Sequence, residues 1–149
     1  MSTLSLISFI SYSCVAFISI LFGLIYLLKN QYMPYHNKAL GLSWSELPEN
    51  MQVLIIALMR AAGGGFLATG LAIFILLIIP GRAGDTWANY AILAIATCTS
   101  LASLYATLLV KVKTPGTPPV AVSIVTLALT IVGFVSRLST TLPIVPPIY

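Results

Sequence analysis

Four long apolar runs, almost free of charge, constrain the fold of this chain more than any other feature. The first, residues 4–28, contains no charged side chain, and further runs cover 53–79, 87–110 and 120–138. A helix needs about 20 apolar residues, rising ~1.5 Å each, to cross a hydrocarbon core of ~30 Å. The sequence therefore predicts four membrane-spanning segments.

The amino-acid composition also indicates that most of the chain is surrounded by lipid. Only 7% of the 149 residues are charged, whereas 59% are hydrophobic, and seven basic residues stand against three acidic ones. Soluble domains carry roughly a quarter charged residues, so this chain has too few to cover a water-exposed surface. We assign the net charge of +4 to loops that face lipid headgroups, and we expect no nucleic-acid partner.

The apolar runs are continuous, which favours helices over barrel strands, because barrel strands alternate in polarity over about ten residues. Pro80 and the proline-containing segment 114–119 end the second and third runs. The short connections between later runs favour antiparallel neighbours. We predict an all-α membrane protein, an antiparallel bundle of four transmembrane helices. It forms a single transmembrane domain over 1–149, with a polar loop at 29–50 and a proline-rich tail at 139–149.

The positions of the basic residues bear on retention and orientation. The first one, Lys29, follows the opening apolar run, whereas a cleavable signal peptide begins with basic residues, so we expect this run to be retained. The first and third loops carry Lys29, Lys38, Lys111 and Lys113. The opposite side carries Arg82 and Arg137. Cytoplasmic loops are enriched in Lys and Arg, so we predict a multi-pass cell-membrane protein with both termini outside.

Small side chains recur at helical spacing on the predicted spans. Such residues let helix backbones approach one another inside lipid, where hydrophobicity supplies no attraction between helices. The positions predicted to pack closely are Gly63, Gly64, Gly65, Ala68, Cys98, Ala102 and Gly133. The faces of the second and third spans also suggest self-association into a homo-oligomer.

Hydroxyl-bearing residues form rows on all four spans, and two interpretations stay open. The hydroxyls can bond to neighbouring helices or to their own backbone carbonyls, as packing stripes do. Alternatively, they line a narrow ligand pocket between the helices. Such a pocket would draw on Tyr12, Arg60, Thr99, Ser103 and Thr130.

Arg60 has two possible positions. If the second span begins near Met51, Arg60 is nine residues in and lies within the bundle, where a buried cation needs a carboxylate, carbonyls or water. No acidic residue lies inside any predicted span to pair with it. The alternative, which we favour, is that Arg60 reaches lipid headgroups from an extended helix.

The loop at 29–50 carries a dense cluster of polar and aromatic residues. In one interpretation, the cluster is the start of a helix together with an aromatic belt at the headgroups. Ser43 and Glu46 then have the spacing of a capping box. As a functional lid, it would make His36 a general base or proton carrier partnered by Glu46 or Glu49. The lid residues would be Tyr35, His36, Trp44 and Glu46.

Other chemistries find little support in the sequence. Cys14 and Cys98 are isolated cysteines, so no Cys-x-x-Cys redox pair exists, and a single histidine is too few for a zinc or bis-histidine haem site. A proton-coupled exporter would need an acid within a span, and the three acids fall in loops. We predict no catalytic residues, no metal site and no cofactor.

Several short motifs resemble a pattern found in small four-helix bacterial inner-membrane proteins without an assigned activity. They are Tyr32-Met-Pro-Tyr-His36, residues 41–44, and Ala57-Leu-Met-Arg60 followed by Gly63-Gly-Gly65. The resemblance covers about residues 21–110. It implies four helices and a bacterial inner membrane, and it implies no chemistry.

Two functions follow from these patterns. The first is a non-enzymatic accessory subunit whose small-residue faces bind a second copy or another membrane protein. The second is a protein that binds or processes a lipophilic ligand or lipid, with a pocket between the helices near Arg60 and a lid from the first loop. A channel ranks third, because no ring-forming charge lines a span. The expected partners are membrane lipids and other transmembrane helices.

Overall fold

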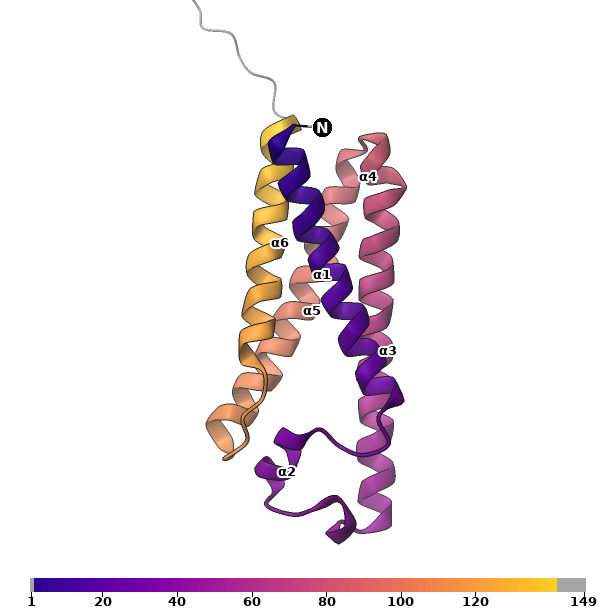
Figure 1. The fold of residues 1–149 in the computed structure, drawn as a ribbon, viewed down its shortest axis with the longest axis vertical. Helices are drawn as coiled ribbons and strands as arrows, with labels where there is room; N and C mark the ends of the chain where they lie inside the picture. Colours follow the sequence, from indigo (N-terminus) through magenta and orange to yellow (C-terminus); the bar gives the residue numbers. More distant parts are fainter. Residues whose placement is uncertain (1, 142–149) are drawn as a thin grey trace, which may run out of the picture.

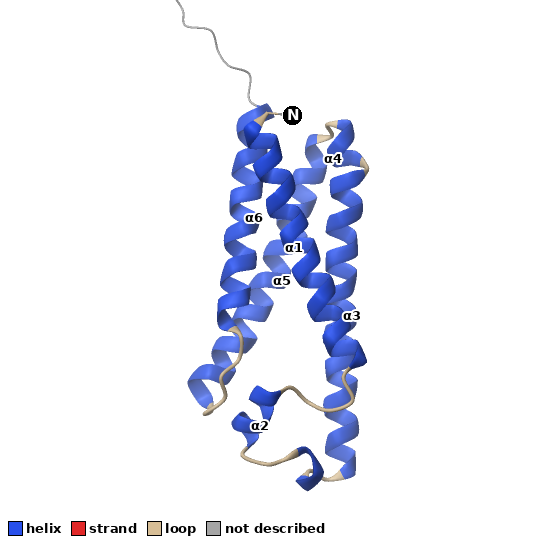
Figure 2. Cartoon of the chain, viewed as in Figure 1, coloured by secondary structure: helices blue, strands red, loops and turns tan. Residues whose placement is uncertain are grey.

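A computed structural model describes residues 2–141 and is helical almost throughout, with no strand among these residues. The four long helices are α1 (Thr3–Leu28), α3 (Glu49–Ile78), α5 (Thr86–Lys113) and α6 (Val120–Thr141) (Figure 2). The short elements are α2 (Pro34–Leu40), a 3₁₀ turn (Trp44–Glu46) and α4 (Pro80–Ala83). Four helical segments are long and apolar enough to cross a membrane, as predicted.

Each long helix packs against two others. α1 lies between α3 and α6, and α5 contacts the same two helices. The start of α1, the end of α6 and the short helix α4 lie at one end of the molecule, and α2 lies at the other (Figure 1). α5 leans away from α3 towards the α2 end, where the first loop crosses between them (Figure 1).

Glycine contacts set the distance between α1 and α3. A Cβ atom at Gly63 would lie 2.9 Å from the carbonyl oxygen of Gly23 and from the backbone nitrogen of Leu27. A Cβ at Gly70 would lie 2.7 Å from the carbonyl oxygen of Ala16. These distances are shorter than van der Waals contact, so the two backbones touch where side chains are absent.

The predicted packing residues fall into two groups. Gly63 forms the contact with α1, and Gly133 on α6 lies against the ring of Tyr12, whose Cε1 would be 2.8 Å from an added Cβ. The other five, Gly64, Gly65, Ala68, Cys98 and Ala102, make no such contact: Cβ atoms at the two glycines would meet nothing within 4 Å, and the remaining three residues are exposed. Successive helix positions differ by about 100° in direction, so Gly63 can face α1 while its neighbours Gly64 and Gly65 do not.

The outward faces of the long helices are apolar. Large side chains such as Phe17, Leu58 and Val112 are 66%, 62% and 74% exposed. The core instead contains Val15, Ile73 and other buried side chains between the helices. Soluble monomers rarely expose continuous apolar surfaces of this extent, so the surface is suited to lipid.

Several element boundaries differ from the sequence-based expectation. α3 begins at Glu49, directly after Pro48, and the Ser43–Glu46 capping box closes the separate 3₁₀ turn. α5 continues through Lys113 because lysine is a good helix former, and it ends where Thr114 precedes Pro115. α6 extends to Thr141 and so includes the first residues of the predicted tail. Residues 142–149 of that tail lie outside the described residues.

Candidate functional site: a hydroxyl-lined cleft between α3 and α5

The divergence of α5 from α3 leaves a cleft of about 600 Å³ at the α2 end of the molecule. It adjoins a narrow inner cavity of about 50 Å³ that reaches α1 and α6. The residues that line both hollows are Tyr26, Phe66, Thr69, Thr99, Ser103 and Thr107. We call the two hollows together the α3–α5 cleft.

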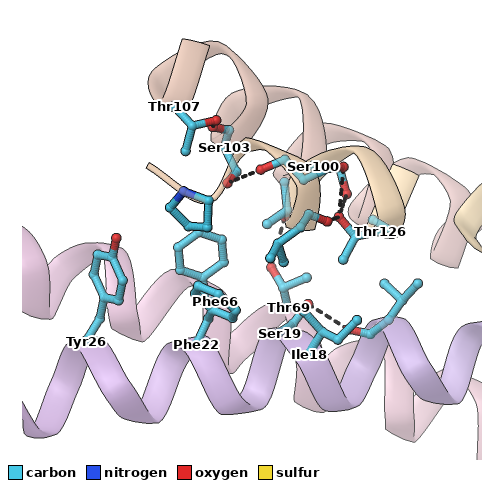
Figure 3. Close-up of a pocket in the computed structure, with 16 residues that line it drawn as sticks. Ile18, Ser19, Phe22, Tyr26, Phe66, Thr69, Ser100, Ser103, Thr107 and Thr126 are labelled. Atoms are coloured by element: carbon cyan, nitrogen blue, oxygen red, sulfur yellow. Dashed lines mark hydrogen bonds between the residues drawn. The ribbon is translucent and has the colours of Figure 1, made fainter. Parts of the chain in front are cut away.

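Hydroxyl groups form one wall of the α3–α5 cleft. Ser100 donates to the Thr126 hydroxyl at 3.1 Å, and Ser103 pairs with Ser123 at 2.9 Å, so these bonds join α5 to α6. The rings of Phe22 and Phe66 face these hydroxyls across the inner cavity (Figure 3). The inner cavity is therefore polar on one side and aromatic on the other.

A second hydroxyl pair bridges α3 and α5 at the junction of the two hollows. Thr69 and Thr99 lie 3.0 Å apart through their Oγ1 atoms, and either can be the donor. The bond between the two hydroxyls uses one of their two hydrogens, so the other hydrogen can be donated to a ligand. Small side chains line the outer cleft beside it: Ala62, Gly65, Cys98, Ala102 and Ala106.

Aromatic residues from α1 and α2 form the mouth of the cleft. The hydroxyls of Tyr26 and Tyr35 lie 2.5 Å apart, and the Tyr35 ring packs edge-on against His36 with ring centroids 4.2 Å apart. Burial, together with the bond to Tyr26, raises the pKa of Tyr35 above its usual value. Burial lowers the pKa of His36. Both groups are therefore neutral at pH 7.

The His36 ring has a defined tautomer when neutral. Its Nδ1 accepts a bond of 3.3 Å from the Met33 backbone N–H, so the proton lies on Nε2. His36 is thus bonded to backbone, and neither glutamate is its partner. Glu46 is exposed and accepts the Ser43 backbone N–H at 2.6 Å, which lowers the pKa of its carboxyl group.

Trp44 lies beside the mouth, in the packing that holds the first loop in place. Its ring packs edge-on against Tyr32, with centroids 5.0 Å apart, in a small core with Leu47 and Met59. The Gln52 side chain donates to the backbone oxygens of both Trp44 and Leu47. Trp44 and Glu46 therefore shape the loop without lining the cleft.

Three predicted pocket residues lie elsewhere. Arg60 is exposed on α3 and does not line the cleft. Thr130 is fully buried, and its hydroxyl donates to the Thr126 carbonyl one turn earlier on α6. Tyr12 is buried near the opposite end of the bundle, where it donates to Asn89 Oδ1 at 2.5 Å.

The structure thus brings together four of the predicted ligand residues, Thr99, Ser103, Tyr35 and His36. It adds Tyr26, Phe66 and Thr69, which were not predicted as site residues. Tyr26 follows Ser19 at helical spacing on 4–28, and Thr69 continues the small-residue row on 53–79, so periodicity carried a signal for both. Nothing local distinguishes Phe66 from a lipid-facing aromatic residue.

The described residues that line the α3–α5 cleft include no Asp, Glu, Lys or Arg. Residues 2–141 also contain no group of three side chains that could hold a metal ion. The polar groups present are hydroxyls and one neutral imidazole. This arrangement can donate and accept hydrogen bonds, and it is suited to an uncharged ligand.

The lowered pKa of His36 predicts a pH effect on stability. A histidine whose folded pKa lies below the unfolded value near 6.5 makes the unfolded state bind more protons, so stability is lost as the pH falls through that value. We expect the wild type to lose more thermal stability between pH 7.5 and pH 5.5 than His36→Asn, which keeps an acceptor for the Met33 N–H. Thermal unfolding in detergent at both values measures this, and equal losses would contradict it.

Comparison with protein-family models, curated proteins and solved structures finds no match to this chain. Function must therefore be inferred from the site itself. The relevant features are an open cleft between α3 and α5, small and hydroxyl side chains along it, and a neutral aromatic mouth formed by Tyr26, Tyr35 and His36.

Proposed function

We propose that this protein is an integral membrane protein that binds an uncharged amphipathic lipid in the α3–α5 cleft. The apolar chain would lie along Ala62, Gly65, Ala102 and neighbouring small residues, and the polar group would bond to the hydroxyls of the cleft, at its mouth or at the Thr69–Thr99 pair. The observation that carries the proposal is a cleft of about 600 Å³ with hydroxyl groups and no charged side chain among its described lining residues. Ligand pockets typically measure roughly 300–1,000 Å³.

The membrane placement that goes with this proposal is an antiparallel bundle with the α2 end at the cytoplasmic face of a bacterial inner membrane. α3 has 30 residues, so its length of about 45 Å exceeds the ~30 Å hydrocarbon core. The 18 residues after Arg60 in α3 nearly suffice to cross that core, so the exposed Arg60 side chain can reach headgroups. Lys29 and Lys38 in the first loop and Lys111 and Lys113 in the last turn of α5 favour the cytoplasmic side, with both termini opposite.

The absence of charge in the described lining favours an uncharged ligand over an anionic one. A phosphate or carboxylate inside an apolar cleft loses its hydration and needs a cation or several donors in return. Neutral alcohols, esters and ketones need one or two hydrogen bonds. The Tyr26–Tyr35 pair and the His36 Nε2–H can supply these at the mouth.

The site supports binding rather than turnover. Catalysis by His36 would require a positioned partner or nucleophile, whereas its Nδ1 is bonded to the Met33 backbone N–H. The nearby Tyr35 hydroxyl is a poor proton donor because its pKa is raised. The lipid would therefore be held for storage, transfer or presentation.

An accessory subunit that binds another transmembrane helix is the second candidate. The row Ala94, Cys98, Ala102 and Ala106 on α5 is exposed along its whole length. Small residues at intervals of four permit close helix approach in lipid. This row borders the α3–α5 cleft, so a docked helix and a bound lipid would compete for the same surface.

Lipid competition tests the proposed function. The full chain, purified in a mild detergent, would be offered equal amounts of a diacylglycerol and a phosphatidic acid with the same chains, and retained lipid measured by native mass spectrometry. We expect the diacylglycerol to be retained, and its retention, unlike that of the phosphatidic acid, to depend on the hydroxyls of the α3–α5 cleft. The double substitution Thr69→Val and Thr99→Val keeps the shape of the cleft and removes one hydroxyl pair, and it should weaken retention about three- to tenfold. Unchanged diacylglycerol retention in the double variant, or no retention in the wild type, would contradict the proposal.

A further inference from the structure

A second cavity, of about 260 Å³, lies at the opposite end of the bundle, beside α4 and the start of α1. All four long helices and α4 contribute to its wall. Its polar lining differs from that of the α3–α5 cleft. It consists of Ser5, Ser8, Tyr12, Arg82, Asn89 and Arg137.

The Tyr12–Asn89 bond fixes the orientation of the amide in this cavity. Tyr12 donates its hydroxyl proton to Asn89 Oδ1, so the Nδ2 group of Asn89 is the donor end that remains. Asn89 is 8% exposed, yet its Nδ2 donates no hydrogen bond within residues 2–141. No fully buried side-chain nitrogen or oxygen in these residues lacks a partner, so Nδ2 must reach the cavity.

Ser8 adds a second donor on the α1 side. Its side chain is 3% exposed and lines the cavity, and its hydroxyl makes no hydrogen bond within the described part of the chain. By the same reasoning, this hydroxyl faces the hollow. Ser8 is one turn before Tyr12, so the hydroxyl and the Asn89 amide approach the cavity from two different helices.

Two arginines give this cavity a positive lining. Arg137 on α6 is half-buried, and its Nη2 donates to the Gly81 carbonyl oxygen at 3.0 Å, which holds the guanidinium at the wall. Arg82 follows on α4. No acidic residue is among the described lining residues, and Asp85, the nearest acid along the chain, is exposed. Asn89 also lies in the first turn of α5, where the helix dipole favours negative charge.

We propose that this cavity binds an oxyanion, a phosphate or carboxylate group, between the Arg137 guanidinium, the Asn89 Nδ2 group and the Ser8 hydroxyl. Guanidinium and amide donors supply the charge-assisted bonds that such a group needs. The cavity is at the end of the bundle, so the oxyanion could belong to a lipid headgroup or to a free anion. The inference does not depend on the neutral-lipid proposal for the other end.

The test uses the full chain in a nonionic detergent, with phosphatidylglycerol, phosphatidylcholine and inorganic phosphate as probes. Native mass spectrometry would measure retained lipid, and added inorganic phosphate would be tested as a competitor. We expect phosphatidylglycerol to be retained over phosphatidylcholine, or inorganic phosphate to bind directly. Retention without competition identifies a lipid headgroup, and direct phosphate binding identifies a free oxyanion. Equal retention of both lipids that Asn89→Asp leaves unchanged, without phosphate binding, overturns the proposal.

Variants locate the site. Asn89→Asp keeps the acceptor for the Tyr12 hydroxyl while replacing the donor with a negative charge, and we expect it to weaken oxyanion binding at least about tenfold. Arg137→Gln should do the same. Arg60→Gln is the matched control, because it removes an exposed arginine far from this cavity. Unchanged binding in Asn89→Asp, or an equal loss in Arg60→Gln, would overturn the assignment. Helical content from circular dichroism confirms that each variant is folded.

Discussion

Gly63→Ala is expected to destabilise the protein, whereas Gly64→Ala is expected to leave it as stable or slightly more so. The added methyl at Gly63 would lie 2.9 Å from backbone atoms of α1, which cannot move away without separating the two helices. Overpacking of this kind costs about 1–3 kcal/mol. At Gly64 the same methyl meets nothing within 4 Å, and alanine is the better helix former by up to about 1 kcal/mol.

The comparison of these two neighbours isolates the contact. Both variants add one methyl group to α3 and change the intrinsic helix propensity equally, so their difference in free energy of unfolding reports the α1–α3 approach. Unfolding by increasing SDS in mixed micelles measures that difference. Gly65→Ala, which also meets nothing within 4 Å, serves as a second control. Equal stability of all three variants would show that Gly63 does not set the helix distance.

Ala102→Trp should abolish lipid retention at the α3–α5 cleft. Ala102 lines the outer part of the cleft, where an indole would occupy the space proposed for the lipid chain. Its side chain is exposed, so the larger residue can be accommodated without disturbing the core. We expect at least about a tenfold loss of retained uncharged lipid, which corresponds to about 1.4 kcal/mol of binding free energy. Native mass spectrometry of the purified variant provides the measurement.

Ala94→Trp is the control for this substitution. Ala94 belongs to the same exposed row on α5, two turns before Ala102, and does not line the cleft. If the cleft binds lipid, only Ala102→Trp should lose it. If the row instead docks another helix, both variants should lose the partner or the oligomer, which light scattering detects. Full lipid retention in Ala102→Trp would contradict the proposed function.

The sequence predicted part of the site through periodicity. Thr99 and Ser103 were assigned because hydroxyls recur every four residues on 87–110, and the structure places both at the cleft. The hydroxyl rows grouped Tyr12 and Thr130 with them, and Arg60 was added as a cation within an apolar run. A row of residues defines a face of a helix, but it does not give the position along the bundle or the bonding partner. In the structure Tyr12 belongs to the other end of the bundle, Thr130 bonds to its own helix, and Arg60 faces outward.

The amino-acid sequence by itself determined that the chain has four apolar helices long enough for a membrane. The reason is local, because backbone groups in lipid must form hydrogen bonds within their own helix. The length of each apolar run can therefore be counted directly along the sequence. The tertiary structure alone decided which glycine faces another helix and where the helices separate. Gly63 and Gly65 are indistinguishable in sequence, yet one touches α1 and the other lines an open cleft. That difference depends on contacts between residues about forty positions apart, such as Gly23 with Gly63, which no local pattern specifies.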